Sequence, residues 1–231
     1  FVVWLKNHKF VQKLQLTCMK RSDFVIVIGR QYGSGGRELG QMLARRLGIP
    51  YYDKALLSEA AGRLGFRADL FERADEKRPS FFSSLLSANY GSSTYFAPGA
   101  MHNATLYQMQ SDVIRNLMDS PCVIVGRTAD YIGRERKNVV SIFLHADNAY
   151  RVSRTHCLHP GLPDDSAAME IMAKKDAERQ TYYNYFTGRK WGDAANYHLS
   201  LCTSLFSTER AADLVCRYLD LMADEIGNEN S

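Results

Sequence analysis

Short runs of aliphatic and β-branched residues recur along the chain, each bounded by polar residues or glycine. They occupy residues 24–28, 122–126 and 139–144, with a shorter example at 199–202. Runs of this kind are typical of strands buried on both faces of a parallel sheet. Helical stretches separate them. The pattern predicts an α/β fold, a three-layer open parallel sheet with helices on both faces.

A glycine-rich segment follows the first predicted strand directly. Its members are Gly33, Ser34, Gly35 and Gly36. The apolar residues of 37–47 then share one face of a predicted helix. Glycines let backbone N–H groups crowd an anion, and the helix dipole adds favourable charge. The segment predicts a phosphate site, and the alternative is a tight strand-to-helix turn without a ligand.

The segment departs from the phosphate-loop pattern G-x-x-x-x-G-K-[ST]. With Gly35 as the second glycine, Arg30 stands at the first glycine, Gly36 at the lysine and Arg37 at the magnesium-binding hydroxyl. The usual cation and metal ligand are both missing. We expect Arg37 to supply the charge as a fork to phosphate oxygens, and Ser34 offers the nearest hydroxyl.

Further basic residues follow the later strands. Arg127 comes at the end of the run 122–126, where ligands gather in parallel sheets. Arg151 and Arg154 lie at i,i+3 after the next strand, where they could neutralise moving charge, or could form a solvated basic face. Arg179 lies on a later helix with Lys175 and Asp176, which an ordinary salt-bridged surface helix would also explain.

Two segments do not fit a plain sheet-and-helix core. Residues 79–105 are rich in Ser, Gly, Asn and aromatics, which predicts a mobile insertion over a ligand site, or else an ordered loop that caps the core. Residues 166–192 combine basic side chains with tyrosines, Phe186 and Trp191, as in a helix that runs into an aromatic, basic turn.

The charge is unevenly distributed. The chain carries 29 Lys and Arg against 25 Asp and Glu. Residues 1–22 hold five of these bases and no acid, so the rest of the chain has 24 bases and 25 acids. We therefore expect no nucleic-acid or membrane partner, a dispensable basic leader over 1–22 and a single domain over 23–227. Five widely spaced cysteines without a C-x-x-C pair favour a reducing cytoplasm.

Four separated motifs together resemble the cytidylate kinase-like family. They are residues 28–38, 47–54 and 123–127, followed by Asp176-x-x-Arg179 with the aromatic residues after it. The resemblance covers roughly residues 24–220. It implies a P-loop nucleoside monophosphate kinase with an acceptor-binding insertion and an arginine-bearing lid over 166–192. It also implies ATP and Mg²⁺ as the donor system, with CMP or dCMP as the acceptor.

The resemblance also assigns residues to roles. It implies an ATP phosphate loop over Gly33, Ser34, Gly35, Gly36 and Arg37, acceptor contacts at Asp53 and Arg127, and a lid arginine at Arg179. Arg37, Arg151, Arg154 and Arg179 would then be catalytic, stabilising the charge of the transferring group. The sequence assigns neither metal ligands nor an oligomeric state. The alternatives are a non-catalytic nucleotide-binding sensor and a kinase of another small molecule.

Overall fold

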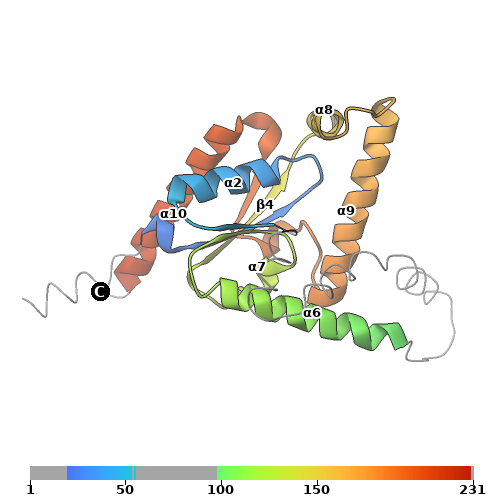
Figure 1. Cartoon of the computed structure of the whole chain (residues 1–231). Coiled ribbons are helices and arrows are strands. Elements are labelled where there is room, and N and C mark those ends of the chain that lie inside the picture. The colour runs from blue at the N-terminus through green and yellow to red at the C-terminus, as the bar shows by residue number, and fades with distance from the viewer. Residues whose placement is uncertain (1–19, 54, 56–97, 230–231) are drawn as a thin grey trace, which may run out of the picture.

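The computed structural model describes residues 20–53, 55 and 98–229. Its centre is a five-stranded sheet in the order β2-β3-β1-β4-β5, in which every neighbouring pair is parallel (Figure 1). In chain order, the strands are β1 Val25–Arg30, β2 Tyr51–Tyr52, β3 Val123–Val125, β4 Val139–His145 and β5 Leu199–Cys202. The α/β class and the parallel sheet predicted from the hydrophobic runs are confirmed.

Helices cover both faces of this sheet, as Figure 1 shows. Helices α2 (Gly36–Leu47) and α10 (Thr208–Glu229) pack on one face, and α6 (Pro98–Leu117) and α7 (Ala129–Ile132) pack on the other. Ile26 and Ile28 of β1 point to the first face while Val25 and Val27 point to the second. This alternation follows from the two-residue period of a strand, and it explains why β1 is an unbroken apolar run.

Two more helices stand beside the carboxyl ends of the strands (Figure 1). They are α8 (Asn148–Leu158) and α9 (Asp165–Thr187), which pack against each other. Asp164 caps α9 by accepting a hydrogen bond from the Ala167 N–H at 2.9 Å, and Gly188 ends it in a left-handed conformation with φ 66°. Most of the segment expected to form the lid, residues 166–192, is therefore one long helix.

Short 3₁₀ turns complete the described fold: η1 Arg21–Asp23, η2 Ala194–Asn196 and η3 Thr203–Leu205. The first begins at the end of the predicted leader, where Arg21 pairs with Asp220 of α10 at 2.8 Å. Residues 1–19 of that leader lie outside the described residues. None of the helices in the described part of the chain is long and apolar enough to cross a membrane.

The predicted insertion over 79–105 meets the structure only at its end. Residues 98–105 form the first turns of α6, and residues 79–97 lie outside the described part. Strand β2 follows from no hydrophobic run, because two residues are too few to show a period. At the end of β2, Asp53 Oδ1 accepts a hydrogen bond from the Ala55 N–H at 3.1 Å.

The order of the strands creates a crevice at the end of β1. The chain passes from β1 to β2 and β3 on one side, then crosses to β4 and β5 on the other. Ligands of open parallel sheets bind at such a switch point. Ile28 pairs in register with Val125, and Arg30 with Leu144, so β1 ends between the ends of its two neighbours.

Candidate phosphate-binding site

The loop after β1 has the conformation of an anion cradle. Gly33 and Gly35 have φ 75° and 79°, values that side chains disfavour, and α2 begins at Gly36. A Cβ at Gly33 would meet the Arg151 carbonyl oxygen at 2.8 Å, so the loop also packs tightly on α8. Glycine is thus required at Gly33 twice, by conformation and by space. The first backbone N–H groups of α2 face the crevice with the positive end of the helix dipole.

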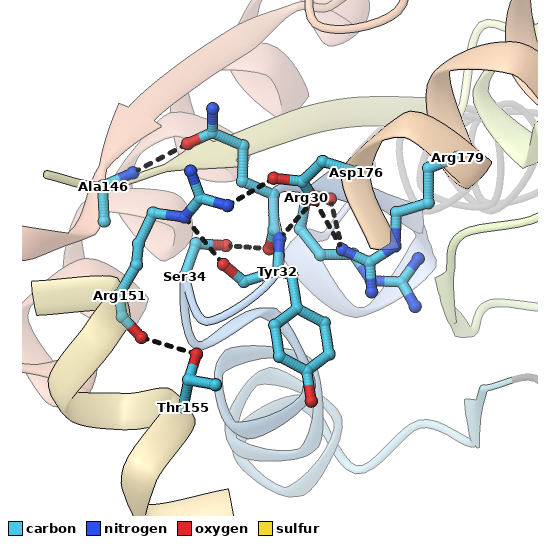
Figure 2. Close-up of polar contacts among 9 residues, drawn as sticks. Arg30, Tyr32, Ser34, Ala146, Arg151, Thr155, Asp176 and Arg179 are labelled. Atoms are coloured by element: carbon cyan, nitrogen blue, oxygen red, sulfur yellow. Dashed lines mark hydrogen bonds and ion pairs between the residues drawn. The ribbon is translucent and has the colours of Figure 1, made fainter. Parts of the chain in front are cut away.

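Helix α9 holds this loop through a single carboxylate. Asp176 Oδ1 accepts hydrogen bonds from the Tyr32 N–H at 2.7 Å and from Arg179 Nη1 at 3.2 Å, and its Oδ2 pairs with Arg151 Nη2 (Figure 2). Arg151 Nε donates to the Tyr32 carbonyl oxygen at 2.7 Å. Burial raises the pKa of Asp176, while the Tyr32 amide and both arginines act to lower it.

Arg151 therefore fixes the loop. It is buried between Tyr32 and Asp176, and its carbonyl oxygen accepts from Thr155 Oγ1 at 2.8 Å. The sequence places Arg151 and Arg154 on one helical face but does not tell which of them is buried. Arg154 is more open. It pairs with Glu38 of α2 at 2.7 Å, and its guanidinium is 3.8 Å from the position of a Cβ at Gly35.

The turn after β3 is the second feature of the site. Gly126, Arg127 and Thr128 all have positive φ, at 90°, 63° and 55°. Arg127 and Thr128 are the non-glycine residues with positive φ in the described part of the chain. Such conformations cost energy and collect at ligand sites. They aim Arg127 from the end of β3, the position that the sequence predicted for it.

Four arginines converge between these two turns: Arg30, Arg37, Arg127 and Arg179. Burial lowers the pKa of Arg30 to about 9, and the charges of the other three act in the same direction. Arg179 Nη1 also donates to the Arg30 carbonyl oxygen at 3.2 Å, and Figure 2 shows the two side chains together. A concentration of guanidinium groups of this kind favours phosphate oxygens.

Arg37 lies at the rim of the cluster. Its side chain is 67% exposed, and its Nε lies 3.4 Å from Asp53 Oδ2. Two residues that the sequence assigned to different substrates, the loop arginine and the acceptor aspartate, are therefore in contact. This contact joins the start of α2 to the end of β2.

An aromatic cluster lies beside the turn after β3. Tyr107 of α6 stacks on Phe186 of α9, with ring centroids 4.1 Å apart, and its hydroxyl lies 3.2 Å from Thr128 Oγ1. Burial raises the pKa of Tyr182 to about 12, and Arg127 acts on the same hydroxyl in the opposite direction. The basic, aromatic character predicted for the end of 166–192 is thus concentrated next to Arg127.

A buried acid lies directly behind this turn. Asp130 of α7 is 8% exposed, and the Tyr183 hydroxyl donates to its Oδ2 at 2.7 Å. Burial raises the pKa of Asp130, and the hydrogen bond from Tyr183 offsets part of that effect. The hydrogen bond between Asp130 and Tyr183 joins α7 to α9.

The residues present offer little for Mg²⁺. Ser34, the nearest hydroxyl, is fully buried and donates to the Gln31 carbonyl oxygen at 2.9 Å. Within the described ranges no group of three or more His, Cys, Asp or Glu side chains could hold a metal ion. This donor set does not fit a magnesium ion held by the protein alone. The glycine loop and arginines do fit the phosphates of a nucleotide.

Sequence reasoning missed two features of this site. Arg30 was given no role of its own in the site, although a cation at the end of a buried strand is itself a signal. The contact from Asp176 to Tyr32 joins residues 144 positions apart, and no local pattern encodes it.

The sheet order and the glycine-rich turn between β1 and α2 define a parallel α/β protein with the P-loop kinase fold. The model of the cytidylate kinase-like family matches residues 25–205. The match covers well over half of the chain, so the protein belongs to this family. The family supports a kinase that uses a nucleotide, and the resemblance seen in the four sequence motifs is confirmed.

Several solved structures are similar to this chain. An uncharacterized protein from Eubacterium ventriosum ATCC 27560 is 26% identical with a TM-score of 0.63, and the match covers 85% of this chain and 98% of that one. A shikimate kinase from Bacteroides thetaiotaomicron is 14% identical, with a TM-score of 0.49 and coverage of 85% and 98%. A gluconokinase from Sinorhizobium meliloti 1021 is 11% identical, with a TM-score of 0.49 and coverage of 92% and 100%. No curated protein matches the chain.

Proposed function

We propose that this protein transfers a phosphoryl group from ATP to a nucleoside monophosphate, CMP or dCMP, giving the diphosphate and ADP. The observation that carries the proposal is the pair of turns after β1 and β3. One turn offers backbone N–H groups and the other offers Arg127. Two anion sites side by side suit two phosphate-bearing ligands that meet end to end.

The chemistry asks the protein mainly to position the reactants and neutralise charge. The loop from Gly33 to Gly36 would hold the donor phosphates, and Arg127 would hold the acceptor phosphate. Arg37 and Arg179 reach the space between them, and Arg154 lies beside Gly35. Arg151 would contribute by keeping Tyr32 and the loop in place.

Helix α9 would act as the lid. It contacts the loop through Asp176 and Arg179, two residues that approach the site from the same helix face. A ligand that brings phosphates to this loop would strengthen the contact with Arg179. Closure of this kind excludes water, which would otherwise accept the phosphoryl group in place of the acceptor.

Two features support a pyrimidine nucleotide as acceptor. The family is named for cytidylate kinase, and the aromatic cluster of Tyr107, Tyr182 and Phe186 lies beside Arg127. An aromatic surface next to a phosphate-binding arginine suits a base attached to a monophosphate. Asp53, which contacts Arg37, would bind the acceptor from the other side.

A second candidate function is nucleotide sensing without catalysis. Ser34 is tied to the Gln31 carbonyl, and position 36 carries glycine where a phosphate loop carries lysine. The lysine and the free hydroxyl of a phosphate loop are groups that catalysis usually needs and nucleotide binding does not. The same experiment separates the two functions.

The test is an assay of the full chain with Mg-ATP and a panel of acceptors: CMP, dCMP, UMP, AMP, GMP, shikimate and gluconate. We expect ADP to form with CMP or dCMP and the matching diphosphate to accumulate. If only another compound of the panel were phosphorylated, that compound would replace CMP and dCMP as the proposed acceptor. Nucleotide binding with no turnover on any acceptor would establish the sensor and contradict the kinase.

A further inference from the structure

Arg30 occupies space that belongs to another residue in an ordinary phosphate loop. A Cβ at Gly36, the position of the loop lysine, would lie 2.9 Å from Arg30 Cγ and 3.0 Å from Arg30 Cβ. A contact that short forces something to move. The aliphatic part of Arg30 therefore fills the start of the path that a lysine at position 36 would take.

The guanidinium of Arg30 lies at the other turn. Its Nη1 is 2.1 Å, and its Cζ 3.2 Å, from the position of a Cβ at Gly126. Only glycine at position 126 leaves room for it. The side chain thus runs from the first residue of α2 to the residue before Arg127, across the gap between the two proposed phosphate sites.

Nothing described in the structure neutralises this guanidinium. Among residues 20–53, 55 and 98–229, no acid forms an ion pair with Arg30. Arg136 shows what a structural arginine does in the same protein: it donates to the Met118 and Arg115 carbonyl oxygens and pairs with Asp119 at 2.9 Å. Arg30 differs in that, within the described ranges, its guanidinium has no such ion pair, while its carbonyl oxygen accepts from Arg179 Nη1.

Arg30 is half-buried, and a partly desolvated cation among like charges is unfavourable unless an anion joins it. Desolvation and the three neighbouring arginines lower the pKa of Arg30 to about 9, which still leaves it charged at neutral pH. The ligand-free protein therefore holds a charge that its described neighbours do not balance. A phosphate between the two turns would supply the counter-charge.

We propose that Arg30 replaces the phosphate-loop lysine, delivering its cation from the end of β1 to the phosphoryl group that passes between donor and acceptor. The role rests on the proposed function. It also accounts for two glycines: Gly36 makes room for the stem of Arg30 and Gly126 makes room for its guanidinium. A lysine reaches these phosphates as a point charge, whereas a guanidinium grips two oxygens at once.

The first experiment compares Arg30→Met with Arg45→Met, which removes the same charge from an exposed position on α2. Binding of inorganic tripolyphosphate and of ATP is measured by calorimetry, and melting temperature is measured without ligand. We expect Arg30→Met to lower the affinity for tripolyphosphate and for ATP at least tenfold and to raise the ligand-free melting temperature. Arg45→Met should change neither the two affinities nor the melting temperature. A wild-type protein that does not bind tripolyphosphate, or an Arg30→Met protein that binds like the wild type, would overturn the proposal.

The second experiment moves the cation back to its usual position. Gly36→Lys alone should lower the melting temperature and the affinity for ATP, because Arg30 fills the space that the lysine side chain would need. The double variant Arg30→Gly with Gly36→Lys should bind ATP at least tenfold more tightly than Arg30→Gly. Unchanged stability of Gly36→Lys, or no recovery in the double variant, would contradict the exchange of positions.

The two proposals fail separately. Tripolyphosphate binding that depends on Arg30, with no acceptor phosphorylated, would end the kinase proposal and leave the cation site in place. Turnover of CMP by the wild type, with a kcat/KM of Arg30→Met within twofold of the wild-type value, would support the kinase proposal and end the proposal for Arg30.

Discussion

The turns after β1 and β3 meet the same geometric demand in opposite ways. Both need left-handed backbone, but the first assigns it to Gly33 and Gly35, while the second imposes it on Arg127 and Thr128 after Gly126. Under the proposed function, the first turn would bind phosphate with its backbone N–H groups, which a side chain would obstruct. The second turn would present the Arg127 side chain, which glycine would remove. Strained backbone of the kind seen at Arg127 and Thr128 collects at functional sites.

The strained turn has compensating contacts. Thr128 is 4% exposed, its hydroxyl donates to the Arg127 carbonyl oxygen at 2.6 Å, and its own carbonyl accepts from the Tyr131 and Ile132 N–H groups at 3.0 Å. These bonds start α7 directly from the turn. A short helix thus holds Arg127 in a conformation that an isolated peptide would avoid.

The largest effect should come from breaking the first turn with Gly33→Ala. The left-handed conformation alone costs an alanine about 1–2 kcal/mol, and the new Cβ also meets the Arg151 carbonyl oxygen at 2.8 Å. We expect reduced stability and at least a tenfold loss of ATP affinity, measured by chemical denaturation and calorimetry.

Gly48→Ala is the matched control for that variant. Gly48 also has positive φ, at 67°, but a Cβ there would meet nothing within 4 Å. It should cost about 1 kcal/mol and leave ATP affinity unchanged. Equal effects of the two variants on ATP affinity would show that the first turn does not bind phosphate.

The second turn should respond differently to two substitutions at Arg127. Arg127→Ala and Arg127→Gly both remove the guanidinium, so each should raise the KM for the acceptor at least tenfold. Only glycine relieves the left-handed strain, so Arg127→Gly should be the more stable of the two by about 1 kcal/mol. Steady-state kinetics and denaturation measure the two effects. If alanine and glycine were equally stable, the turn would carry no strain.

The smallest effect concerns the acid behind the second turn. Asp130→Asn keeps an oxygen that accepts from Tyr183 but removes a buried charge. Because the folded-state pKa of Asp130 lies above its unfolded value, ionisation costs stability as the pH rises through the folded-state pKa. Asparagine should therefore raise the melting temperature by about 2–4 °C at pH 7.

That gain should shrink as the pH falls towards 4, because both side chains are then neutral. Melting curves of both proteins from pH 4 to 8 measure it. A gain that stays constant across this range would assign the effect to packing instead of charge.

The sheet was largely predictable from the sequence. The runs that form β1, β3 and β4 are buried on both faces, so they carry a strong and continuous apolar signal. The run that forms β5 is shorter and weaker because β5 is an edge strand with Ser200 exposed. Strand β2 consists of Tyr51 and Tyr52 alone, and its pairing with β3 is a property of the assembled sheet. The glycine loop and helix α2 were predictable because turn conformation and helix periodicity are local.

The site was predictable only in part, because its contacts are not local. Asp176 was expected to pair with a basic residue of its own helix, and it pairs with Arg179, but it also reaches Arg151 of α8 and Tyr32 of the loop. Lys175, the other expected partner, instead lies 3.6 Å from Glu178. The path of Arg30 depends on the space left by two glycines 90 positions apart, which no spacing rule reveals. All the roles assigned to site residues stay predictions: those of the loop 33–37 and of Asp53, Arg127, Arg151, Arg154 and Arg179.

The register of β1 on β3 sets limits on how this protein can diverge. Ile28 pairs with Val125, and the Gly126 N–H donates to the Ile28 carbonyl oxygen at 3.0 Å. Main-chain hydrogen bonds, which do not depend on the identity of the side chains, thus fix the separation of the two turns. Under the proposed function, substitutions could reshape the acceptor side while this separation stays the same. A scaffold of this kind would acquire new substrates without moving its two turns.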